Sequence, residues 1–310
     1  MQRLLALLTF LVAGISFGNA QFAAGAGTTS TKAALLSEVR SIALGKSFFT
    51  ALQLAHPEEW HSYYKNSGGV EWPPSLVWTL PEGFTAGPLQ WPVPEVKDGF
   101  SGKSFVYHGT PVFLVEITPP GSLKTVEPVT LTAMATWQIC KESCINEEKS
   151  FTLVLPVTAE AEVDPAQTAL FEKARLSQAR VLPNLEVSAH SDGGDLHFLL
   201  TPGDAIMEAP ADFIPDQPFL QPASAGGNIQ REESAWLITL KRKKMDFFDQ
   251  PVVQGKSFSG ILTGPAAIQI PDTPILHPPA RPLPFSKYLP ILGGMLLGGL
   301  ILNLMPCVFP

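Results

Sequence analysis

The strongest constraint on the fold is a regular alternation of apolar and polar side chains in the middle of the chain. From residue 129 to residue 139, the odd positions carry Val, Leu, Ala, Ala, Trp and Ile. Residues 151–157 repeat the alternation, with Phe, Leu, Leu and Val at the odd positions. A period of two buries one face of a β-strand, so both segments are predicted to be strands. If the first strand keeps its phase, Cys140 leaves the core face and points outward.

The rest of the chain also favours β structure. Pro accounts for 30 of 310 residues, about twice its usual share, and prolines break helix interiors. The sequence therefore predicts a mostly β protein, with a β-sandwich followed by a second β-rich domain. The predicted strands lie within residues 33–56 (on both sides of a turn at 44–46), 112–118, 185–189, 196–200, 236–241, 257–262 and 266–270.

Two segments depart from this pattern. Asp164-Pro165 is typical of a helix start, so a connector helix is predicted over residues 164–178. Residues 71–91 contain many prolines and glycines, with three tryptophans between them, and are predicted to be irregular backbone.

Both ends of the chain carry targeting patterns. Arg3 followed by the short apolar run 4–12 and by small residues up to Ala20 is typical of a cleaved secretory signal peptide. An uncleaved anchor helix is the alternative. Residues 289–310 are uncharged and mostly apolar, which predicts the start of a membrane span, preceded by an extended proline-rich lead over 271–284. The bulk of the chain is therefore expected outside the cytoplasmic membrane.

The resulting division has five parts. They are a signal peptide (1–20), a first β-sandwich domain (21–158), a connector helix (159–180), a second β-rich domain (181–285) and the start of a transmembrane segment (286–310). The net charge of -7 argues against nucleic acid as a partner. The basic run 241–244 is expected to be a solvated strand end.

The cysteines suggest chemistry rather than a structural scaffold. The chain has only 3 cysteines, namely Cys140, Cys144 and Cys307. If the strands before Cys140 and after Cys144 form a hairpin, the two cysteines face each other at roughly 4.5–5.5 Å between Cα atoms, within disulfide range. A reversible redox pair and a static staple both remain open. Lys141 would favour a thiolate, and Glu142 would oppose it.

Metal binding is a weaker reading of the same residues. A pair of cysteines with three residues between them could hold Cu(I), and the nearest additional ligands are Met134 and His108. They do not complete an evident ligand set. His56 and His61 are expected to be polar surface. Neither a metal nor a cofactor is predicted.

Several motifs resemble the DsbD family of membrane thiol:disulfide interchange proteins, especially the ScsB branch. The resemblance implies an immunoglobulin-like outer domain, a multi-span redox domain and, in many members, a thioredoxin-like carboxy-terminal domain. Many relatives have proline where Asn146 stands in this chain. The motifs that carry the resemblance are residues 78–84, 90–94, 115–120, 137–144 and 300–310.

The resemblance also implies a function, that of a protein-disulfide reductase in the bacterial inner membrane with this segment mainly periplasmic. Cys140 and Cys144 correspond to the outer-domain pair and Cys307 to the first membrane cysteine. Electrons would pass from cytoplasmic thioredoxin through a membrane domain to the outer pair. The pair would then reduce exported thiol proteins, such as disulfide isomerases, cytochrome c maturation proteins or copper-resistance proteins.

The order of the two outer cysteines is a further expectation. Cys144 lies beyond the loop apex and is expected to join the partner, while Cys140 resolves the mixed disulfide. The alternative function is an immunoglobulin-like binding or adaptor module with a structural disulfide, in copper handling.

Overall fold

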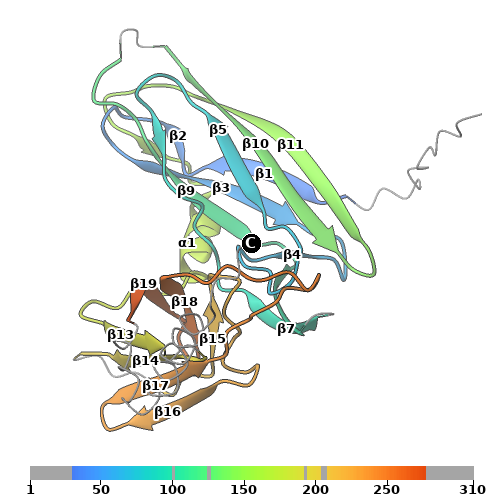
Figure 1. Ribbon diagram of the computed structural model, residues 1–310. Coiled ribbons are helices and arrows are strands. Elements are labelled where there is room, and N and C mark those ends of the chain that lie inside the picture. The colour runs from blue at the N-terminus through green and yellow to red at the C-terminus, as the bar shows by residue number, and fades with distance from the viewer. Residues whose placement is uncertain (1–29, 100–101, 124–126, 192–193, 204–207, 277–310) are drawn as a thin grey trace, which may run out of the picture.

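The computed structural model describes residues 30–99, 102–123, 127–191, 194–203 and 208–276 (Figure 1). The predicted signal peptide, the predicted membrane segment 286–310 and Cys307 lie outside these residues. Within them the chain is mostly β, with a single α-helix. None of the helical structure in the described ranges is long and apolar enough to cross a membrane.

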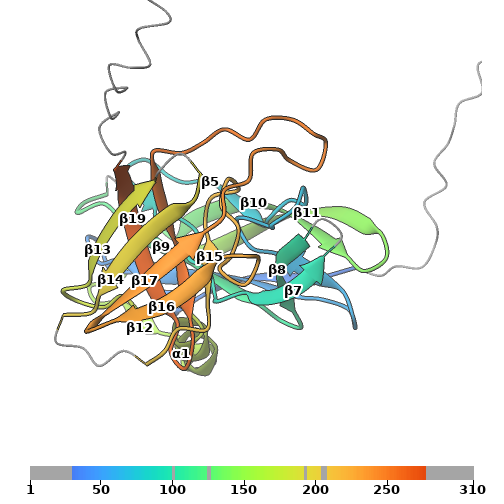
Figure 2. The ribbon, with the colours of Figure 1, turned by 60° about the horizontal axis from the view of Figure 1, so that its bottom comes forward.

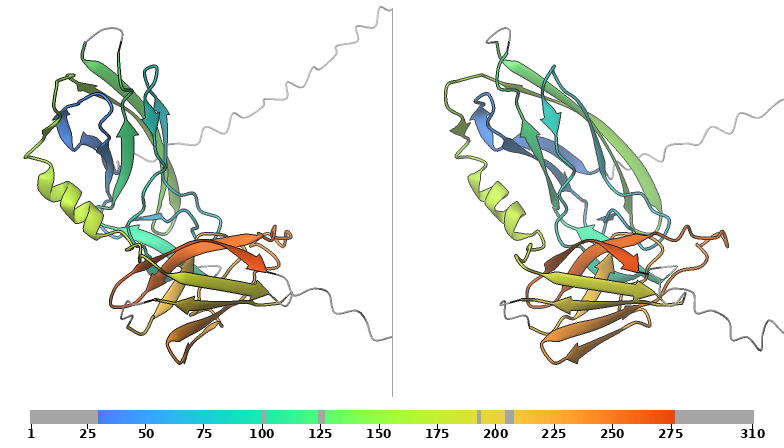
Figure 3. Two further views of the ribbon diagram at one scale, coloured as in Figure 1. Left: turned by 90° about the vertical axis from the view of Figure 1, so that its left-hand side faces the viewer. Right: turned by 60° about the vertical axis from the view of Figure 1, so that its left-hand side comes forward.

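Two sheets pack face to face in the first half of the chain (Figure 3). Their common core includes Leu52 and Phe113 from one sheet and Phe105 and Ile139 from the other, all almost fully buried. The first sheet has the order β1 (Lys32–Ser37), β3 (Phe48–Ala55), β9 (Val112–Thr118) and β6 (Thr85–Ala86). The second has the order β11 (Cys144–Leu155), β10 (Val129–Cys140), β4 (His61–Tyr63), β8 (Gly102–His108) and β7 (Glu95–Gly99), with β5 (Ser75–Thr79) also paired to β10. A small sheet joins β12 (Glu162–Val163) to β2 (Val39–Ser41).

The central hairpin confirms the alternation predicted from sequence. The odd positions of β10 are buried against the opposite sheet, and β10 pairs with β11 along its whole length. β5 was not expected, because residues 71–91 were predicted to be irregular. It forms because the free side of β10 accepts it, with Ala133 opposite Trp78.

A seven-stranded sheet forms the second half of the chain. Its strands, in spatial order, are β15 (Asp212–Pro215), β18 (Ser257–Thr263), β19 (Ile268–Leu276), β13 (Glu186–Ser191), β14 (Leu196–Thr201), β17 (Ala235–Leu240) and β16 (Asn228–Glu232). The five strands predicted in this region are present. β15 and β16 were missed because β15 is short and buried at every position, whereas β16 is polar and mostly exposed.

β19 also runs further than predicted, through two of the prolines assigned to an extended lead. Its register against β18 shifts between Phe258 and Gly260, so Pro271 lies in a bulge where no ladder hydrogen bond is required of it. Beyond the bulge the ladder resumes, with Ser257 opposite Pro274.

The helix α1 (Thr168–Leu176) lies between the two halves in Figure 1 and at the lower edge of the molecule in Figure 2. It begins later than Asp164, because the Asp164 side chain accepts a hydrogen bond from the backbone of Ala166 in a preceding turn. Phe171 and Ala174, one turn apart, pack against the first sheet.

The two halves share buried contacts. Ile214 on β15 and Ile261 on β18 belong to the core of the face-to-face sheets. The basic run was predicted to be solvated, and this is wrong at two positions. The Arg242 guanidinium lies 5.7 Å from the centre of the Phe219 ring, and Lys243 Nζ donates to the carbonyl oxygen of Gly68 at 2.6 Å. Arg242 packs within its own half of the molecule, whereas Lys243 contacts the other half, and no local sequence pattern predicts either contact.

Candidate redox site

The site lies at the open end of the central hairpin. Cys140 is the last residue of β10, Cys144 is the first residue of β11, and the two are directly paired in the ladder. Their Cα atoms are 4.1 Å apart and their sulfurs form a disulfide. The connecting loop is closed by a hydrogen bond from the Lys141 backbone N–H to the Ser143 carbonyl. The disulfide predicted from the spacing is therefore confirmed.

The two cysteines differ in exposure. Cys144 is exposed, whereas Cys140 is only 3% exposed and forms a small buried cluster with Tyr63 and Val106. The prediction that Cys140 points into solvent is wrong. Cys140 does leave the core that contains Ile139, but the face it reaches is covered by residues of β4 and β8.

A row of four side chains crosses this end of the sheet. In the ladder, Cys144 pairs with Cys140, Cys140 with His61, and His61 with His108. Directly paired residues lie on the same face of a sheet. The His61 and His108 ring centroids are 5.2 Å apart, and His108 Nδ1 lies 3.0 Å from a carboxylate oxygen of Glu95.

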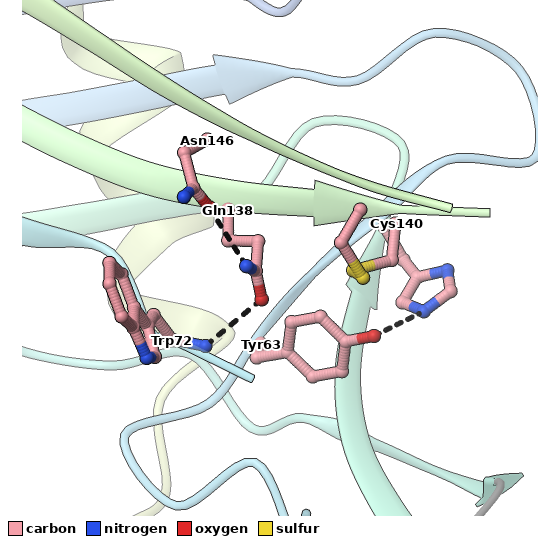
Figure 4. The surroundings of a disulfide bond; sticks show 7 residues. Tyr63, Trp72, Gln138, Cys140 and Asn146 are labelled. Carbon is pink, nitrogen blue, oxygen red and sulfur yellow. Dashed lines mark hydrogen bonds between the residues drawn. A yellow bond between two sulfur atoms is a disulfide. The ribbon is translucent and has the colours of Figure 1, made fainter. Parts of the chain in front are cut away.

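Tyr63 completes the cover over the disulfide (Figure 4). Its hydroxyl lies 3.2 Å from His61 Nε2, within hydrogen-bond distance. Burial, followed by the nearby Glu71 carboxylate, raises the pKa of Tyr63 well above its usual range. The residue beside Cys140 is therefore a neutral phenol at physiological pH.

Two nearby histidines, His56 and His61, are also uncharged at neutral pH. Burial lowers the pKa of His61 to about 4, with further lowering by Lys97 and His108. Burial lowers the pKa of His56 to about 4 as well, and His61 and His108 add to the effect. His61 is only 7% exposed, so the prediction that it belongs to the polar surface is wrong. Neither His56 nor His61 therefore supplies an imidazolium that could stabilise a Cys140 thiolate at pH 7.

The positive charge of Lys141, which was expected to favour a cysteine thiolate, is paired with Glu59. Lys141 Nζ lies 2.5 Å from a carboxylate oxygen of Glu59. Through this hydrogen bond, the pKa of Lys141 is raised and that of Glu59 is lowered. The ammonium therefore interacts mainly with Glu59 and not with a cysteine.

Polar side chains form hydrogen bonds across the hairpin two residues from the disulfide (Figure 4). Gln138 Nε2 donates to Asn146 Oδ1 at 2.8 Å across the two strands. Gln138 Oε1 accepts the backbone N–H of Trp72 at 3.2 Å. Asn146 thus helps to tie the segment ending at Trp72 to the hairpin.

The candidate copper ligands are not assembled around the cysteines. Met134 Sδ accepts a hydrogen bond from Ser150, and His108 pairs with Glu95. Across the described ranges, no three His, Cys, Asp or Glu side chains are grouped so that they could hold a metal ion.

The arrangement presents one accessible sulfur and one shielded sulfur. An exposed cysteine can attack, or be attacked by, another protein, while its neighbour waits within bonding distance to release the product. Tyr63 and His61 were not predicted as site residues. Their position depends on the pairing of β4 with β10, for which the sequence carries no local signal.

A known protein family matches the region that contains Cys140 and Cys144. Residues 33–156 match the family described as thiol:disulfide interchange protein DsbD, N-terminal. In fold, the chain is similar to the N-terminal periplasmic domain of ScsB from Proteus mirabilis, with a TM-score of 0.53 and 17% identity over 78% of this chain and 91% of that chain. A DUF4466 family protein from Parabacteroides merdae has a TM-score of only 0.24 at 8% identity, over 70% of this chain and 99% of that one. No curated protein matches the chain.

Proposed function

We propose that this chain, a DsbD/ScsB-like protein, passes reducing equivalents from a membrane domain to exported partner proteins through Cys140 and Cys144. The observation that carries the proposal is the unequal exposure of two cysteines already placed at bonding distance. A purely structural bridge gains nothing from one open and one covered sulfur, whereas an exchange reaction uses both.

The reaction has two steps. The Cys144 thiolate attacks a sulfur of the partner's disulfide, which forms a mixed disulfide and releases the partner's other sulfur as a thiolate. The Cys140 thiolate then attacks Cys144 Sγ and expels the second partner sulfur. The products are a partner dithiol and the Cys140–Cys144 disulfide, so two electrons move to the partner. A relay that includes Cys307 in the membrane domain would reduce the disulfide again.

Trapping the mixed disulfide tests this order of events. Replacing Cys140 with Ser removes the resolving sulfur, so Cys144 should accumulate a covalent complex with exported proteins. The Cys144→Ser variant should accumulate none, because its remaining sulfur is buried under Tyr63. Equal trapping by the two variants would contradict the assignment of roles.

The reduction potential separates this function from an adaptor module with a structural staple. Structural disulfides of exported proteins lie below about -300 mV, and exchange-active ones lie higher. A potential above that value is expected for Cys140–Cys144, and a lower one would favour the adaptor.

The cellular setting is part of the proposal. We place the protein in the bacterial inner membrane, with the described segment periplasmic. An immunoglobulin-like β-sandwich (21–158) and a second β-rich domain (181–285) would be joined by the connector 159–180. The partners would be exported thiol proteins of the disulfide isomerase, cytochrome c maturation or copper-resistance type. The family match over residues 33–156 supports thiol exchange in general.

A further inference from the structure

One short segment joins the disulfide to the seven-stranded sheet. It comprises residues 63–72, which we call the strap, and runs from Tyr63 at the end of β4 to Trp72. We infer that Asp216, which follows β15, holds the strap so that Tyr63 covers Cys140. Asp216 is thereby a positioning residue for the redox pair. The inference rests on the proposed function, because it explains how one cysteine of the pair is kept as the shielded, resolving one.

Asp216 binds the strap through both carboxylate oxygens. The Tyr64 hydroxyl donates to Oδ1 at 2.5 Å, and Lys65 Nζ lies 2.7 Å from Oδ2. Ser259 on β18 donates to the same Oδ2 at 2.7 Å and orients the carboxylate from its own sheet. The Asp216 side chain is only 9% exposed. Hydrogen bonds to a carboxylate at a mostly buried position are stronger than hydrogen bonds between neutral groups.

Two further contacts hold the middle of the strap to the same sheet. Asn66 Nδ2 donates to the carbonyl oxygens of Pro215 at 2.8 Å and Gln217 at 3.2 Å, on either side of Asp216. Lys243 Nζ donates to the carbonyl oxygen of Gly68 at 2.6 Å. Gly68 has φ +82, so the strap turns there in a conformation that side chains rarely adopt. The strap therefore has a defined path over the seven-stranded sheet.

The first two residues of the strap, Tyr63 and Tyr64, connect the Asp216 contacts to the disulfide. Tyr63 and Tyr64 are consecutive, so their side chains point to opposite faces of the sheet. Tyr63 packs on Cys140, while Tyr64 enters the core between the sheets and reaches Asp216. The two rings share one stretch of backbone. Releasing Tyr64 from Asp216 therefore frees Tyr63 to move off Cys140.

The accessibility of Cys140 reports the position of Tyr63 directly. In the full chain carrying Cys144→Ser, kept reduced, the rate of iodoacetamide modification of Cys140 is followed by mass spectrometry of its peptide. Asp216→Ala should raise this rate about tenfold, which corresponds to about 1.4 kcal/mol in the free energy of opening. Tyr63→Ala should raise it directly. Tyr63→Ala combined with Asp216→Ala should be no faster than Tyr63→Ala alone.

Asp212 provides the matched control. It is also a buried aspartate, 8% exposed and four residues before Asp216, but it accepts hydrogen bonds from Ser224 and from the backbone of Phe213 within its own half of the molecule. Asp212→Ala should leave the Cys140 rate unchanged, with thermal melting confirming that each variant is folded. If Asp216→Ala does not fold, Ser259→Ala loosens the same carboxylate and should accelerate modification by a smaller factor.

Three results would overturn the inference. The first is an unchanged rate of Cys140 modification in folded Asp216→Ala, or in Ser259→Ala where that variant replaces it. The second is an equal acceleration in Asp212→Ala. The third is a double variant, Tyr63→Ala with Asp216→Ala, in which the accelerations of the two single variants multiply. The last result would mean that Asp216 acts independently of Tyr63. Reduction of a partner disulfide by the unmodified chain is measured separately. Its failure alongside the expected alkylation pattern would refute the proposed function and leave the role of Asp216 intact.

Discussion

Mild acid should weaken the fold through two histidines near the disulfide. The pKa of His56 and that of His61 are each lowered from 6.5 to about 4, in both cases mainly by burial. Neither ring nitrogen of His56, nor Nδ1 of His61, has a hydrogen-bond partner among the described residues. In the unfolded chain both rings return to water and to an ordinary pKa.

Proton linkage gives the direction and the size of this change in the free energy of unfolding. Between about pH 6.5 and pH 4 the unfolded chain binds protons that the folded chain does not, so the free energy of unfolding decreases as the pH falls. The stabilisation is fully present above that window. From pH 7 to pH 5 the loss is about 2 kcal/mol for each histidine, and at most about 4 kcal/mol for both.

Urea denaturation followed by tryptophan fluorescence at pH 7, 6 and 5 measures this loss. His61→Gln should reduce the difference between pH 7 and pH 5 by about 2 kcal/mol, whatever its effect at pH 7 alone. His190→Gln, at an exposed position of β13, serves as the control and should keep the full difference. If His61→Gln shows the same pH dependence as the unmodified chain, burial of a neutral His61 is not what the fold depends on.

Three further predictions concern the core, the loop and the relay. Phe113→Ala empties a fully buried position between the two sheets and should lower the free energy of unfolding by about 3–5 kcal/mol, measured by urea denaturation; a loss under about 1 kcal/mol would contradict that packing. Lys141→Ala should leave the denaturation midpoint unchanged, because solvent screens its exposed pair with Glu59; a clear shift would show that the pair matters. Cys307→Ser should leave the isolated outer domain able to exchange thiols but oxidised in the cell, as seen by thiol trapping, and a fully reduced outer pair in those cells would exclude the relay.

The sequence alone determined the hairpin and its disulfide. Alternation along residues 129–139 and 151–157 specified two strands and the face each one buries. A three-residue loop between them then left Cys140 and Cys144 opposite each other. These features are local, because the strand period and the reach of a short loop follow from residues adjacent in the chain. The motif at 137–144 also carried the resemblance to DsbD, and the family match over residues 33–156 agrees with it.

Only the tertiary structure decided what surrounds the disulfide. The phase of β10 sent Cys140 to the face opposite Ile139, but it did not reveal that Tyr63 covers that face. The contact exists because β4 pairs with β10, and because Asp216 lies within reach of Tyr64. Periodicity indicates which face of a strand is apolar, but it does not predict which distant strand pairs with it. Sheet order and cover are set by the packing of the whole chain, so the shielding that separates the two cysteines is a property of the fold.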